Sequence, residues 1–456
     1  MWSNKKLKEA LKVSVTQNIS AGKIVIDSRI IANQDIFLCL KGENFDGHDF
    51  KKEAISKGAS IIIAEKPDLE FAKYEVIVEN SYEALLQLAR YKRLNSQAKF
   101  IAITGSVGKT TFKEALKSVL AKYDNSFATK GNFNNHIGMP LCLANLDENT
   151  KYAIFELGMN HAGEIEFLSN ILKPDLALIT QITEAHIGNF SSIDGIIAAK
   201  AEICSGFSDH SKVILNHSDI YYDKLKSYIH DKLEVNNSNI YSFGCKSDFI
   251  EIRDLKYVKT GISINFKDKI DYTQKFSFFH QALAELLIGI FAILKVLKLD
   301  FPLANNVLEE FKPIEGRGNI EKYVIKDINL TVINDSYNAN FTSMSESIKT
   351  LAKLQKLNFG RKVLIIGDML ELGSMAKTYH QQLAEVIKLA NISKVIAIGD
   401  LMKNLYDILP IEMKLKYYTK LPDNLDVILN ELAHDDLILI KSSKAIGTHK
   451  IIDYIK

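Results

Sequence analysis

The stretch from Gly105 to Thr111 has the residue types and spacing that could bind the phosphates of a nucleotide. It reads GSVGKTT, and Gly108 would let the main chain approach a phosphate closely. Lys109 could reach the β- and γ-phosphates of ATP, and the Thr110 hydroxyl could bind Mg²⁺. The usual pattern for such a loop, G-x-x-x-x-G-K-[ST], needs a glycine where this chain has Ile103. The stretch is therefore either a shorter kind of phosphate loop or an ordinary turn of small residues.

The residues on either side of this loop predict the strand and the helix that would hold it. The run KFIAIT at 99–104 is typical of a buried strand. Apolar residues follow at 112, 115, 116, 119 and 120, which is the spacing of one helix face. A loop between a strand and a helix N-terminus presents main-chain N–H groups that attract phosphate. This context favours a phosphate loop over an ordinary turn.

Three further ionisable side chains stand near the ends of predicted strands or in a predicted helix. Glu156 ends the run YAIFE, so its carboxylate would lie at the carboxyl edge of a sheet, where a hard oxygen ligand suits Mg²⁺. The spacing fits a solvated glutamate about equally well. His186 follows DLALITQIT, and by itself it is more typical of a loop or packed histidine than of a metal ligand. Lys200 would by default be a solvated lysine on a helix.

Strand-like and helix-like runs divide the chain into three blocks. The first ends near residue 98, and a turn-rich stretch, KPIEGRGN at 312–319, separates the second from the third. Strand-like runs alternate with helical segments in the second and third blocks, which predicts largely parallel sheets. Two strand-like runs of the third block end in Gly-Asp, which resembles a doubly wound fold. The run SMSE at 343–346 fits a capping box that starts a helix after Thr342. We expect an α/β protein.

Composition limits the classes of function. The 456 residues are 47% hydrophobic and 25% charged, which is typical of a globular protein, and the net charge of +2 disfavours nucleic acid as the main partner. The four cysteines include no C-x-x-C pair, which favours reduced thiols in a reducing compartment. The most apolar stretch, at 286–294, is too short to span a bilayer and predicts a buried helix. We expect a cytoplasmic protein without a membrane span.

The loop in its shorter form, G-[ST]-x-G-K-[ST], resembles the ATP loop of the Mur ligase family. These enzymes join amino acids or peptides to cell-wall precursors. The resemblance covers nearly the whole chain, and it is closest to the members that add D-alanyl-D-alanine. The D-N-P-R motif of the diaminopimelate-adding members is absent. The motifs that carry the resemblance are DSR at 27–29, KGENFDGHDF at 41–50, GNFNNHIGMP at 131–140, ELGMNHAGEI at 156–165, DSYNANFTSM at 335–344 and GDMLELG at 367–373.

The resemblance implies an ATP-dependent, ADP-forming ligase of peptidoglycan synthesis, and thus of cell shape and division. It would join D-alanyl-D-alanine to UDP-N-acetylmuramoyl-tripeptide through an acyl phosphate, with domain closure before chemistry. The implied domains are a small α/β UDP-precursor-binding domain at 1–98, a central P-loop ATPase-type domain with a parallel or mixed sheet at 99–316, and a C-terminal Rossmann-like, doubly wound domain at 317–456. We expect a monomer.

The resemblance also implies roles for individual residues. Lys109, His186 and Lys200 would be catalytic, and two Mg²⁺ ions would be bound by Thr110, Glu156, His186 and Lys200, the last of these carbamylated. The implied ATP contacts are Gly105, Ser106, Val107, Gly108, Lys109, Thr110, Thr111, His280, Gln281, Arg317 and Asp335. The implied substrate contacts are Ser28, Arg29, Asp46, His48, Asn134, Asn135, Asn160 and His161.

Two motifs depart from the family pattern. The family usually has G-x-H-N-x-x-N before an apolar helix, with asparagine on adenine, whereas this chain keeps His280 but has Gln281 and Ala284. Gln281 could replace one amide, and Ala284 cannot replace the other. The family's K-G-S-R appears as Lys441-Ser442-Ser443-Lys444, which puts a flexible ammonium in place of a planar guanidinium.

Two other interpretations remain open from the sequence. One is another amide ligase of the same superfamily, of the diaminopimelate-adding or folylpolyglutamate type, which would need its own C-terminal motif. The other is a non-catalytic nucleotide-binding homologue. The presence of Lys109, Thr110, Glu156, His186 and Lys200 argues against the second.

Overall fold

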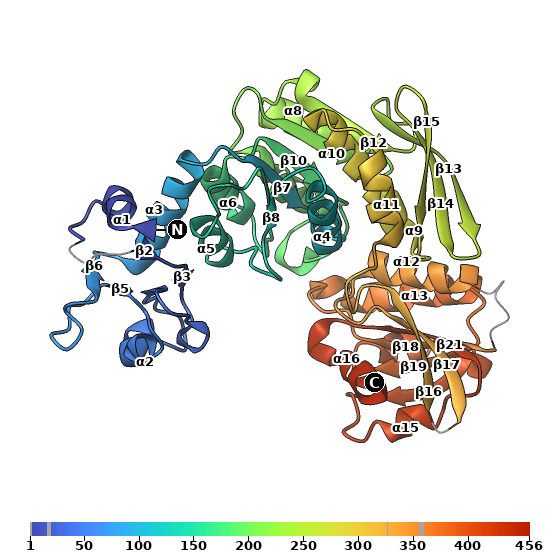
Figure 1. The fold of residues 1–456 in the computed structure, drawn as a ribbon. Coiled ribbons are helices and arrows are strands. Elements are labelled where there is room, and N and C mark those ends of the chain that lie inside the picture. Colours follow the sequence, from blue (N-terminus) through green and yellow to red (C-terminus); the bar gives the residue numbers. More distant parts are fainter. Residues whose placement is uncertain (1, 16–19, 326, 355–359) are drawn as a thin grey trace.

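Three larger sheets organise the part of the chain that the computed structural model describes, namely residues 2–15, 20–325, 327–354 and 360–456 (Figure 1). Helices flank all three sheets, and parallel strands predominate in each. The α/β class predicted from the sequence is confirmed. No described helix is both long and apolar enough to cross a membrane.

The N-terminal sheet has four parallel strands in the order β3-β4-β5-β6. Its strands are β3 (Ile24–Val25), β4 (Ile36–Leu38), β5 (Ile61–Ala64) and β6 (Glu75–Ile77). An antiparallel pair, β1 (Trp2–Ser3) and β2 (Ser20–Ala21), lies apart from this sheet. The helices of this region are α1 (Asn4–Leu11), α2 (Lys51–Ser56) and α3 (Ser81–Leu94). Strands β4 and β5 are buried along their whole length, as is usual when helices or loops cover both faces of a parallel sheet.

The central sheet has nine strands in the order β15-β14-β13-β12-β11-β10-β7-β9-β8. Its strands are β7 (Lys99–Thr104), β8 (Ser126–Ala128), β9 (Tyr152–Glu156), β10 (Leu176–Ile179), β11 (Lys212–Asn216), β12 (Ile240–Gly244), β13 (Ile250–Val258), β14 (Gly261–Lys267) and β15 (Asp271–Phe276). Its helices are α4 (Lys109–Leu120), α5 (Gly138–Ala144), α6 (Glu164–Leu172), α7 (Ile193–Ala201), α8 (Tyr222–Lys232), α9 (Gln281–Leu287), α10 (Gly289–Leu297) and α11 (Pro302–Glu310).

The antiparallel pairs β13–β14 and β14–β15 make the central sheet mixed, which is one of the two forms expected, although these three strands were not predicted individually. Buried and part-exposed residues alternate along β14, which is typical of a sheet that faces solvent on one side. The apolar stretch at 286–294 is buried throughout, as predicted, but it divides between α9 and α10. A side chain at Gly289 would lie 2.9 Å from the ring of Phe243, so glycine allows the close packing of α10 on β12.

The C-terminal sheet has six strands in the order β16-β17-β21-β18-β19-β20, parallel except for β16 at one edge. Its strands are β16 (Asn319–Ile325), β17 (Ile328–Asn334), β18 (Lys362–Gly367), β19 (Lys394–Ile398), β20 (Lys414–Tyr418) and β21 (Asp436–Lys441). Its helices are α12 (Phe341–Lys353), α13 (Ala376–Leu389), α14 (Lys403–Tyr406), α15 (Asp426–Leu429) and α16 (His449–Ile455).

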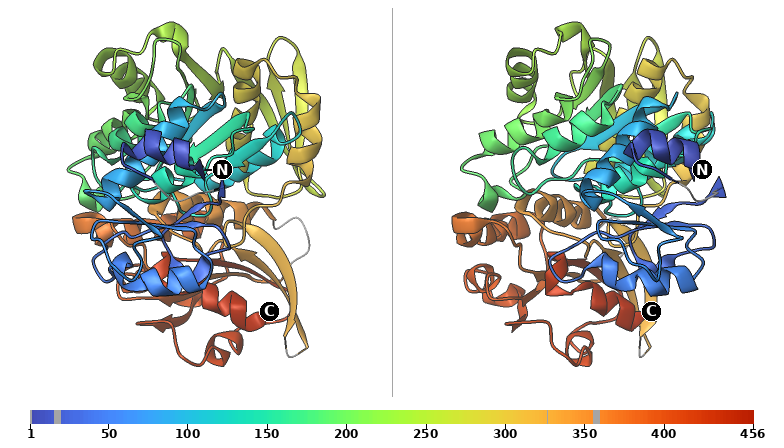
Figure 2. Two further views of the ribbon diagram at one scale, coloured as in Figure 1. Left: turned by 60° about the vertical axis from the view of Figure 1, so that its left-hand side comes forward. Right: turned by 90° about the vertical axis from the view of Figure 1, so that its left-hand side faces the viewer.

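The N-terminal and C-terminal sheets each adjoin the central domain (Figure 1). The N-terminal sheet lies at one end of the molecule and leads into the central sheet through α3, which packs on α5 (Figures 1 and 2). Helices α12 and α13 lie on the side of the C-terminal sheet that faces the central domain (Figure 1). In the central sheet β7 lies between β9 and β10 and is parallel to both, so the loops that follow these three strands meet at one edge.

Candidate active site

The phosphate-loop candidate joins β7 to α4, in the strand–loop–helix order that the sequence predicts. Gly105 and Gly108 both have positive φ, at 145° and 81°, which is a conformation that favours glycine. A Cβ atom at Gly105 would lie 2.0 Å from the Thr180 hydroxyl oxygen, and one at Gly108 would lie 2.4 Å from a methyl carbon of Leu286. The backbone conformation therefore favours glycine at both positions, and a side chain at either would also displace a neighbouring side chain.

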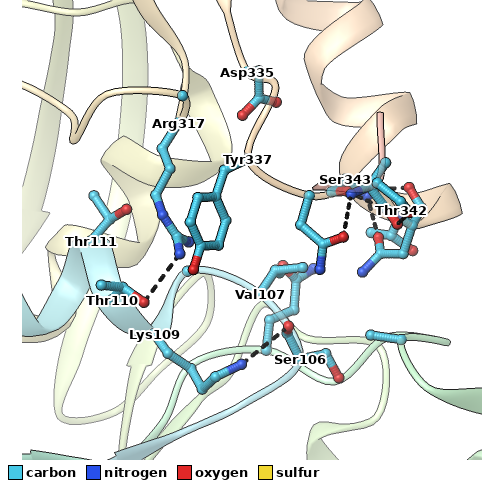
Figure 3. A pocket seen from close by; sticks show the side chains of 18 of the residues that line it. Ser106, Val107, Lys109, Thr110, Thr111, Arg317, Asp335, Tyr337, Thr342 and Ser343 are labelled. Carbon is cyan, nitrogen blue, oxygen red and sulfur yellow. Dashed lines mark hydrogen bonds between the residues drawn. The ribbon is translucent and has the colours of Figure 1, made fainter. Parts of the chain in front are cut away.

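Lys109 is the first residue of α4, and its ammonium lies over the loop (Figure 3). Its Nζ donates to the carbonyl oxygens of Gly105 at 2.8 Å and of Ser106 at 3.4 Å. Burial lowers the pKa of Lys109, and the Arg317 guanidinium lowers it further, while the carboxylate of Glu156 acts in the opposite direction. A phosphate bound at this loop would supply the negative charge that this buried ammonium otherwise shares with carbonyl oxygens.

Glu156 at the end of β9 has one carboxylate oxygen that accepts a hydrogen bond and one that does not, although only 2% of the residue is exposed. Its Oε1 accepts a hydrogen bond from Nδ2 of Asn134 at 2.9 Å. Its Oε2 is buried and has no hydrogen-bond partner among the described residues. A buried carboxylate oxygen that accepts no hydrogen bond costs free energy unless a cation lies near it, and the Lys113 ammonium is 3.7 Å away. This atom therefore fits a hard cation such as Mg²⁺.

Lys113, which the sequence analysis did not single out, is fully buried one turn after Lys109. Its Nζ donates to the carbonyl oxygens of Thr129 at 2.6 Å and Gly131 at 3.3 Å, and it lies 3.7 Å from Oε2 of Glu156. The ammonium thus ties the phosphate-loop helix to the segment that leads to Asn134. Nothing in the sequence distinguishes it from the exposed Lys117 one turn later.

His186 lies in the loop that follows β10, in a left-handed conformation with φ of 64°. Its Nδ1 is 2.5 Å from a carboxylate oxygen of Glu371 in the C-terminal domain, but the two groups are not aligned as a hydrogen bond. Burial lowers the pKa of His186, and Glu371 offsets part of that effect. The histidine therefore stands at the boundary between the two domains.

Lys200 on α7 is buried, with 1% of the residue exposed. Its ammonium has neither a hydrogen bond nor an ion pair with any described residue. Burial lowers the pKa of Lys200 far below its ordinary value, and the nearby charge of Lys109 lowers it further. An unpaired buried lysine is unusual, because its charged form is strongly disfavoured.

The C-terminal domain supplies the opposite wall of the site. Nη2 of Arg317 donates to the hydroxyl of Thr110 at 3.2 Å, and the guanidinium lies 4.1 Å from the ring centre of Tyr337 (Figure 3). Asp335, which is largely buried, accepts hydrogen bonds from Lys441 at 2.6 Å and Ser347 at 2.5 Å. Arg317 thus already contacts the phosphate loop from the other domain.

A cavity of about 500 Å³ lies between the central and C-terminal domains (Figure 3). Its wall combines the phosphate loop with an apolar strip of α9 and with charged groups of both domains. Among the residues that line it are Ser106, Val107, Gly108, Lys109, Thr110, Thr111, Asn134, Glu156, His186, His280, Leu283, Leu286, Arg317, Asp335, Glu371, Lys441 and Lys444. Within the described chain no three His, Cys, Asp or Glu side chains gather to hold a metal, so a metal ion here would need other oxygen ligands, such as the Thr110 hydroxyl, phosphate or water.

The N-terminal candidates are bonded mainly to one another and to their neighbours. Both ring nitrogens of His48 are occupied, Nδ1 by Asp46 at 2.6 Å and Nε2 by the N–H of Glu65 at 3.1 Å. The hydroxyl of Ser28 donates to Glu53 at 2.6 Å. Arg29 is exposed and pairs with the carboxylate of Asp27, which holds the pKa of that carboxyl below its usual value.

Other predicted site residues also have local partners. Asn135 caps α5, where its Oδ1 accepts from the N–H of Gly138 at 2.8 Å. Asn160 and His161 are exposed and do not line the cavity, and their main-chain N–H groups bond to Glu164.

The two departures from the family pattern differ in where they lie. Gln281 does not line the cavity, because its amide donates to Glu285 at 2.7 Å. His280 does line it, and its Nδ1 accepts from the N–H of Leu283 at 3.2 Å. Lys441 is buried against Asp335, whereas Lys444 is exposed and lies 5.4 Å from the ring centre of Tyr337.

Comparison with known proteins covers the chain from end to end. Three family models match in order: "Mur ligase family, catalytic domain" at 22–95, "Mur ligase middle domain" at 103–284 and "Mur ligase, glutamate ligase domain" at 322–444. The UDP-N-acetylmuramoyl-tripeptide–D-alanyl-D-alanine ligase of Rickettsia prowazekii is 37% identical over 100% of this chain and 99% of its own length. The enzyme of the same name from Bacillus subtilis is 30% identical over 94% of this chain and 92% of its own length.

Solved structures give the same match. A crystal structure of MurF from Acinetobacter baumannii has a TM-score of 0.85 and 28% identity, and the alignment covers 100% of this chain and 98% of that one. MurF ligase from Thermotoga maritima in complex with ADP has a TM-score of 0.80 and 25% identity, with 95% of this chain and 96% of that one covered.

Proposed function

This chain belongs to the Mur ligase family, and we propose that it joins D-alanyl-D-alanine to UDP-N-acetylmuramoyl-tripeptide in peptidoglycan synthesis. Membership makes it an ATP-dependent, ADP-forming ligase. The observation that carries the proposal is the cavity in which the phosphate loop faces Arg317 and Asp335 of the next domain. The names of the similar enzymes from R. prowazekii and B. subtilis support the choice of substrates.

The positive groups at the loop suit the first step of such a ligation. The carboxylate of the UDP-linked peptide must approach the γ-phosphate of ATP, although both are anionic. Lys109 and Arg317 reach the loop from opposite domains, so they would reduce this repulsion and stabilise the phosphoryl group during transfer. The carboxylate oxygen bonds to phosphorus as ADP leaves, which gives an acyl phosphate.

The second step needs a free amine and an active site from which water is excluded. The free amine of D-alanyl-D-alanine attacks the acyl carbon, the bond to the phosphate oxygen breaks, and an amide and inorganic phosphate result. Water would instead return the acyl phosphate to the carboxylate. Contact between the central and C-terminal domains, as at Arg317 and Thr110, would exclude that water.

The donor set in the cavity fits Mg²⁺. Oε2 of Glu156 is buried and accepts no hydrogen bond from the described residues, and the Thr110 hydroxyl lines the same cavity. We propose that these two groups hold one ion, and that His186 and a modified Lys200 hold a second. Bound Mg²⁺ would neutralise charge on the phosphates during transfer. The side chains contribute the fixed positions: Asn134 orients Glu156, and Lys113 anchors the segment before Asn134.

Lys200 fits this set only if it is modified. As an ammonium it would repel a cation, whereas a carbamate on its Nζ would supply anionic oxygen ligands. Carbamylation requires the neutral amine, and the burial that lowers the pKa of Lys200 favours that form. The lack of any acidic partner for its Nζ among the described residues supports the same proposal.

We further propose a division of labour among the three domains. Residues 1–98 would bind the UDP precursor, 99–316 would bind ATP, and 317–456 would close on the nucleotide and present the dipeptide. The loops after β3 and β4 carry Ser28, Arg29, Asp46 and His48, of which Arg29 is the exposed charged group. We propose Arg29 as the contact to the precursor, with the others shaping its loop.

The decisive experiment supplies candidate substrates one at a time. The purified chain would be incubated with ATP, Mg²⁺ and UDP-N-acetylmuramoyl-tripeptide, and ADP and the ligated product would be measured with D-alanyl-D-alanine, with L-alanyl-L-alanine or with a single amino acid. Product that requires D-alanyl-D-alanine is expected. Ligation of a single amino acid in place of D-alanyl-D-alanine would refute the substrate assignment. ATP hydrolysis at the same rate with and without both peptide substrates would also refute it.

A further inference from the structure

Glu184 connects the central and C-terminal domains, although no sequence motif predicts a role for it. It follows β10 in the central domain, and 9% of the residue is exposed. Its Oε1 accepts the main-chain N–H of Thr342 at 2.6 Å, and its Oε2 accepts the hydroxyl of Thr342 at 2.7 Å. Thr342 is 158 residues away and lies in the first turn of α12. Both carboxylate oxygens are thus used by one residue of the other domain.

The contact with Glu184 completes the hydrogen bonding of the main-chain N–H groups at the N-terminus of α12. A helix begins with main-chain N–H groups that have no partner inside the helix, and they carry partial positive charge. Asn340, the N-cap, accepts the N–H of Ser343 at 2.8 Å, and Ser343 accepts the N–H of Asn340 at 3.1 Å. That local capping box leaves the N–H of Thr342 for Glu184. Nδ2 of Asn340 also crosses the boundary, to the hydroxyl of Thr183 at 3.3 Å.

The residue before Glu184 is tied to the phosphate loop. The hydroxyl of Ser106 accepts the N–H of Thr183 at 3.0 Å and donates to the carbonyl of Thr183 at 3.2 Å. The N–H of Ser106 donates to the carbonyl of Gln181 at 2.7 Å. Two adjacent residues, Thr183 and Glu184, therefore connect the phosphate loop on one side with α12 on the other.

A second contact lies a few residues further along the same loop. The N–H of Gly188 donates to the carbonyl of Glu371 at 3.0 Å, and a Cβ atom at Gly188 would lie 2.9 Å from main-chain atoms of Glu371 and Gly373. Glu371 has a positive φ of 63°, which is uncommon for a residue with a side chain. The loop from Thr183 to Gly188 thus forms a continuous docking surface for the C-terminal domain.

We propose that Glu184 is a positioning residue that docks the C-terminal domain on the loaded phosphate loop. The inference rests on the proposed ligation, because it explains how closure would follow ATP. A phosphate that orders Ser106 also orders Thr183, which places the Glu184 carboxylate against the first turn of α12. By linkage, docking of α12 strengthens phosphate binding to the same extent.

Loss of this contact has a chemical consequence that a purely structural role would not produce. Poor docking admits water to the acyl phosphate, which then breaks down to the carboxylate and inorganic phosphate instead of the amide. ATP is still converted to ADP. The ratio of ADP formed to amide formed is one when the site excludes water. It therefore rises when the domains dock poorly.

The test uses the full chain with changes on both sides of the contact. Glu184→Ala removes both acceptors, Glu184→Gln keeps one oxygen without the charge, and Thr342→Val removes only the hydroxyl. Asn80→Ala is the matched control, because Asn80 caps α3 by accepting the N–H of Glu83 at 2.8 Å within the N-terminal region. It removes a helix cap that does not cross to the C-terminal domain.

The first readout is independent of activity. Hydrogen exchange of the Thr342 amide, without substrates and with Mg²⁺ and a non-hydrolysable ATP analogue, reports the contact itself. We expect about tenfold or faster exchange in Glu184→Ala, an intermediate value in Glu184→Gln and no change in Asn80→Ala. The analogue should slow exchange in the wild type and not in Glu184→Ala. Unchanged exchange in Glu184→Ala would overturn the inference whatever the reaction is.

The second readout is the ADP-to-amide ratio. It should rise at least about tenfold in Glu184→Ala, rise less in Glu184→Gln and Thr342→Val, and stay at one in Asn80→Ala. The double variant Glu184→Ala/Thr342→Val should match Glu184→Ala alone, because both changes break one contact. Effects that multiply, or a ratio of one in Glu184→Ala, would overturn the inference. A wild type that forms no amide refutes the proposed function instead.

Discussion

Replacing Lys113 with methionine should destabilise the central domain strongly. The Lys113 ammonium is fully buried, donates to the carbonyl oxygens of Thr129 and Gly131, and lies 3.7 Å from the buried carboxylate of Glu156. Methionine has a similar length and fills the same space without the charge or the donors. The change leaves two carbonyl oxygens and a carboxylate without their cation.

The size of the effect follows from these contacts. Removing one partner of a buried ion pair costs about 3–5 kcal/mol, because the remaining charge is left buried. In a unit of about 150–250 residues each kcal/mol lowers the melting temperature by about 2–4 °C. The melting transition of the central domain should therefore fall by about 6–20 °C.

Differential scanning calorimetry of the full chain would measure this shift. Lys117→Met is the matched control, because Lys117 lies one turn further along α4 and is exposed. Its expected shift is within about 2 °C of zero. If Lys113→Met melts within that same range, the Lys113 contacts do not stabilise the domain and the reasoning is wrong.

Three further predictions concern the site and its surroundings. Lys109→Ala should keep a wild-type melting curve but lose at least about a hundredfold of its ligation rate, because the ammonium over the phosphate loop is gone; a near-normal rate would contradict the assigned ATP site. Lys200→Ala should lose most ligation and regain part of it with added acetate or propionate, whereas Lys200→Arg should fail without rescue; full activity of Lys200→Ala alone would exclude the proposed carbamate. His380 is buried, with Nε2 accepting from Met369 and Nδ1 facing the carbonyl of Ala376, and burial lowers its pKa. Since the unfolded chain then binds a proton at higher pH than the folded one, stability should fall as the pH drops below about 6.5, and melting curves from pH 8 to pH 5 should show a smaller fall in His380→Gln.

The phosphate-loop region could be read from the sequence because its signals are local. A buried strand, two glycines and an amphipathic helix occur in order within one short stretch, and each has a direct structural meaning. The same holds for the α/β class, since strand and helix periodicities alternate along the chain.

Local signals do not decide the role of a polar residue that has two possible uses. Ser28, His48 and Asn135 remain predicted substrate contacts, and in the structure their polar atoms bond to Glu53, to Asp46 and Glu65, and to the first turn of α5. The capping box predicted at 343–346 was displaced: α12 begins at Phe341, and Ser343 pairs with Asn340 as its N-cap. A hydroxyl or amide that can cap a helix looks the same in sequence as one that binds a ligand.

Long-range contacts could not be predicted from the sequence for a different reason. Glu184 with Thr342, and His186 with Glu371, join residues that are far apart along the chain. No periodicity relates such positions, because the pairing depends on how two independently built sheets approach each other. Lys113 was missed because the sequence does not distinguish it from Lys117, the exposed lysine one turn later on α4.

The crowding around Gly105 and Gly108 limits which substitutions could make this protein resistant to an inhibitor that binds the phosphate loop. A compound that binds the main-chain N–H groups of the loop contacts atoms that every amino acid possesses, so only a change of backbone shape could evade it. A side chain at Gly105 would strike Thr180, and one at Gly108 would strike Leu286, in backbone conformations that L-residues rarely adopt. Escape at these two positions would disable the loop itself. Selection under such a compound should therefore yield substitutions at the rim of the cavity, and compounds that avoid the rim should retain their potency longest.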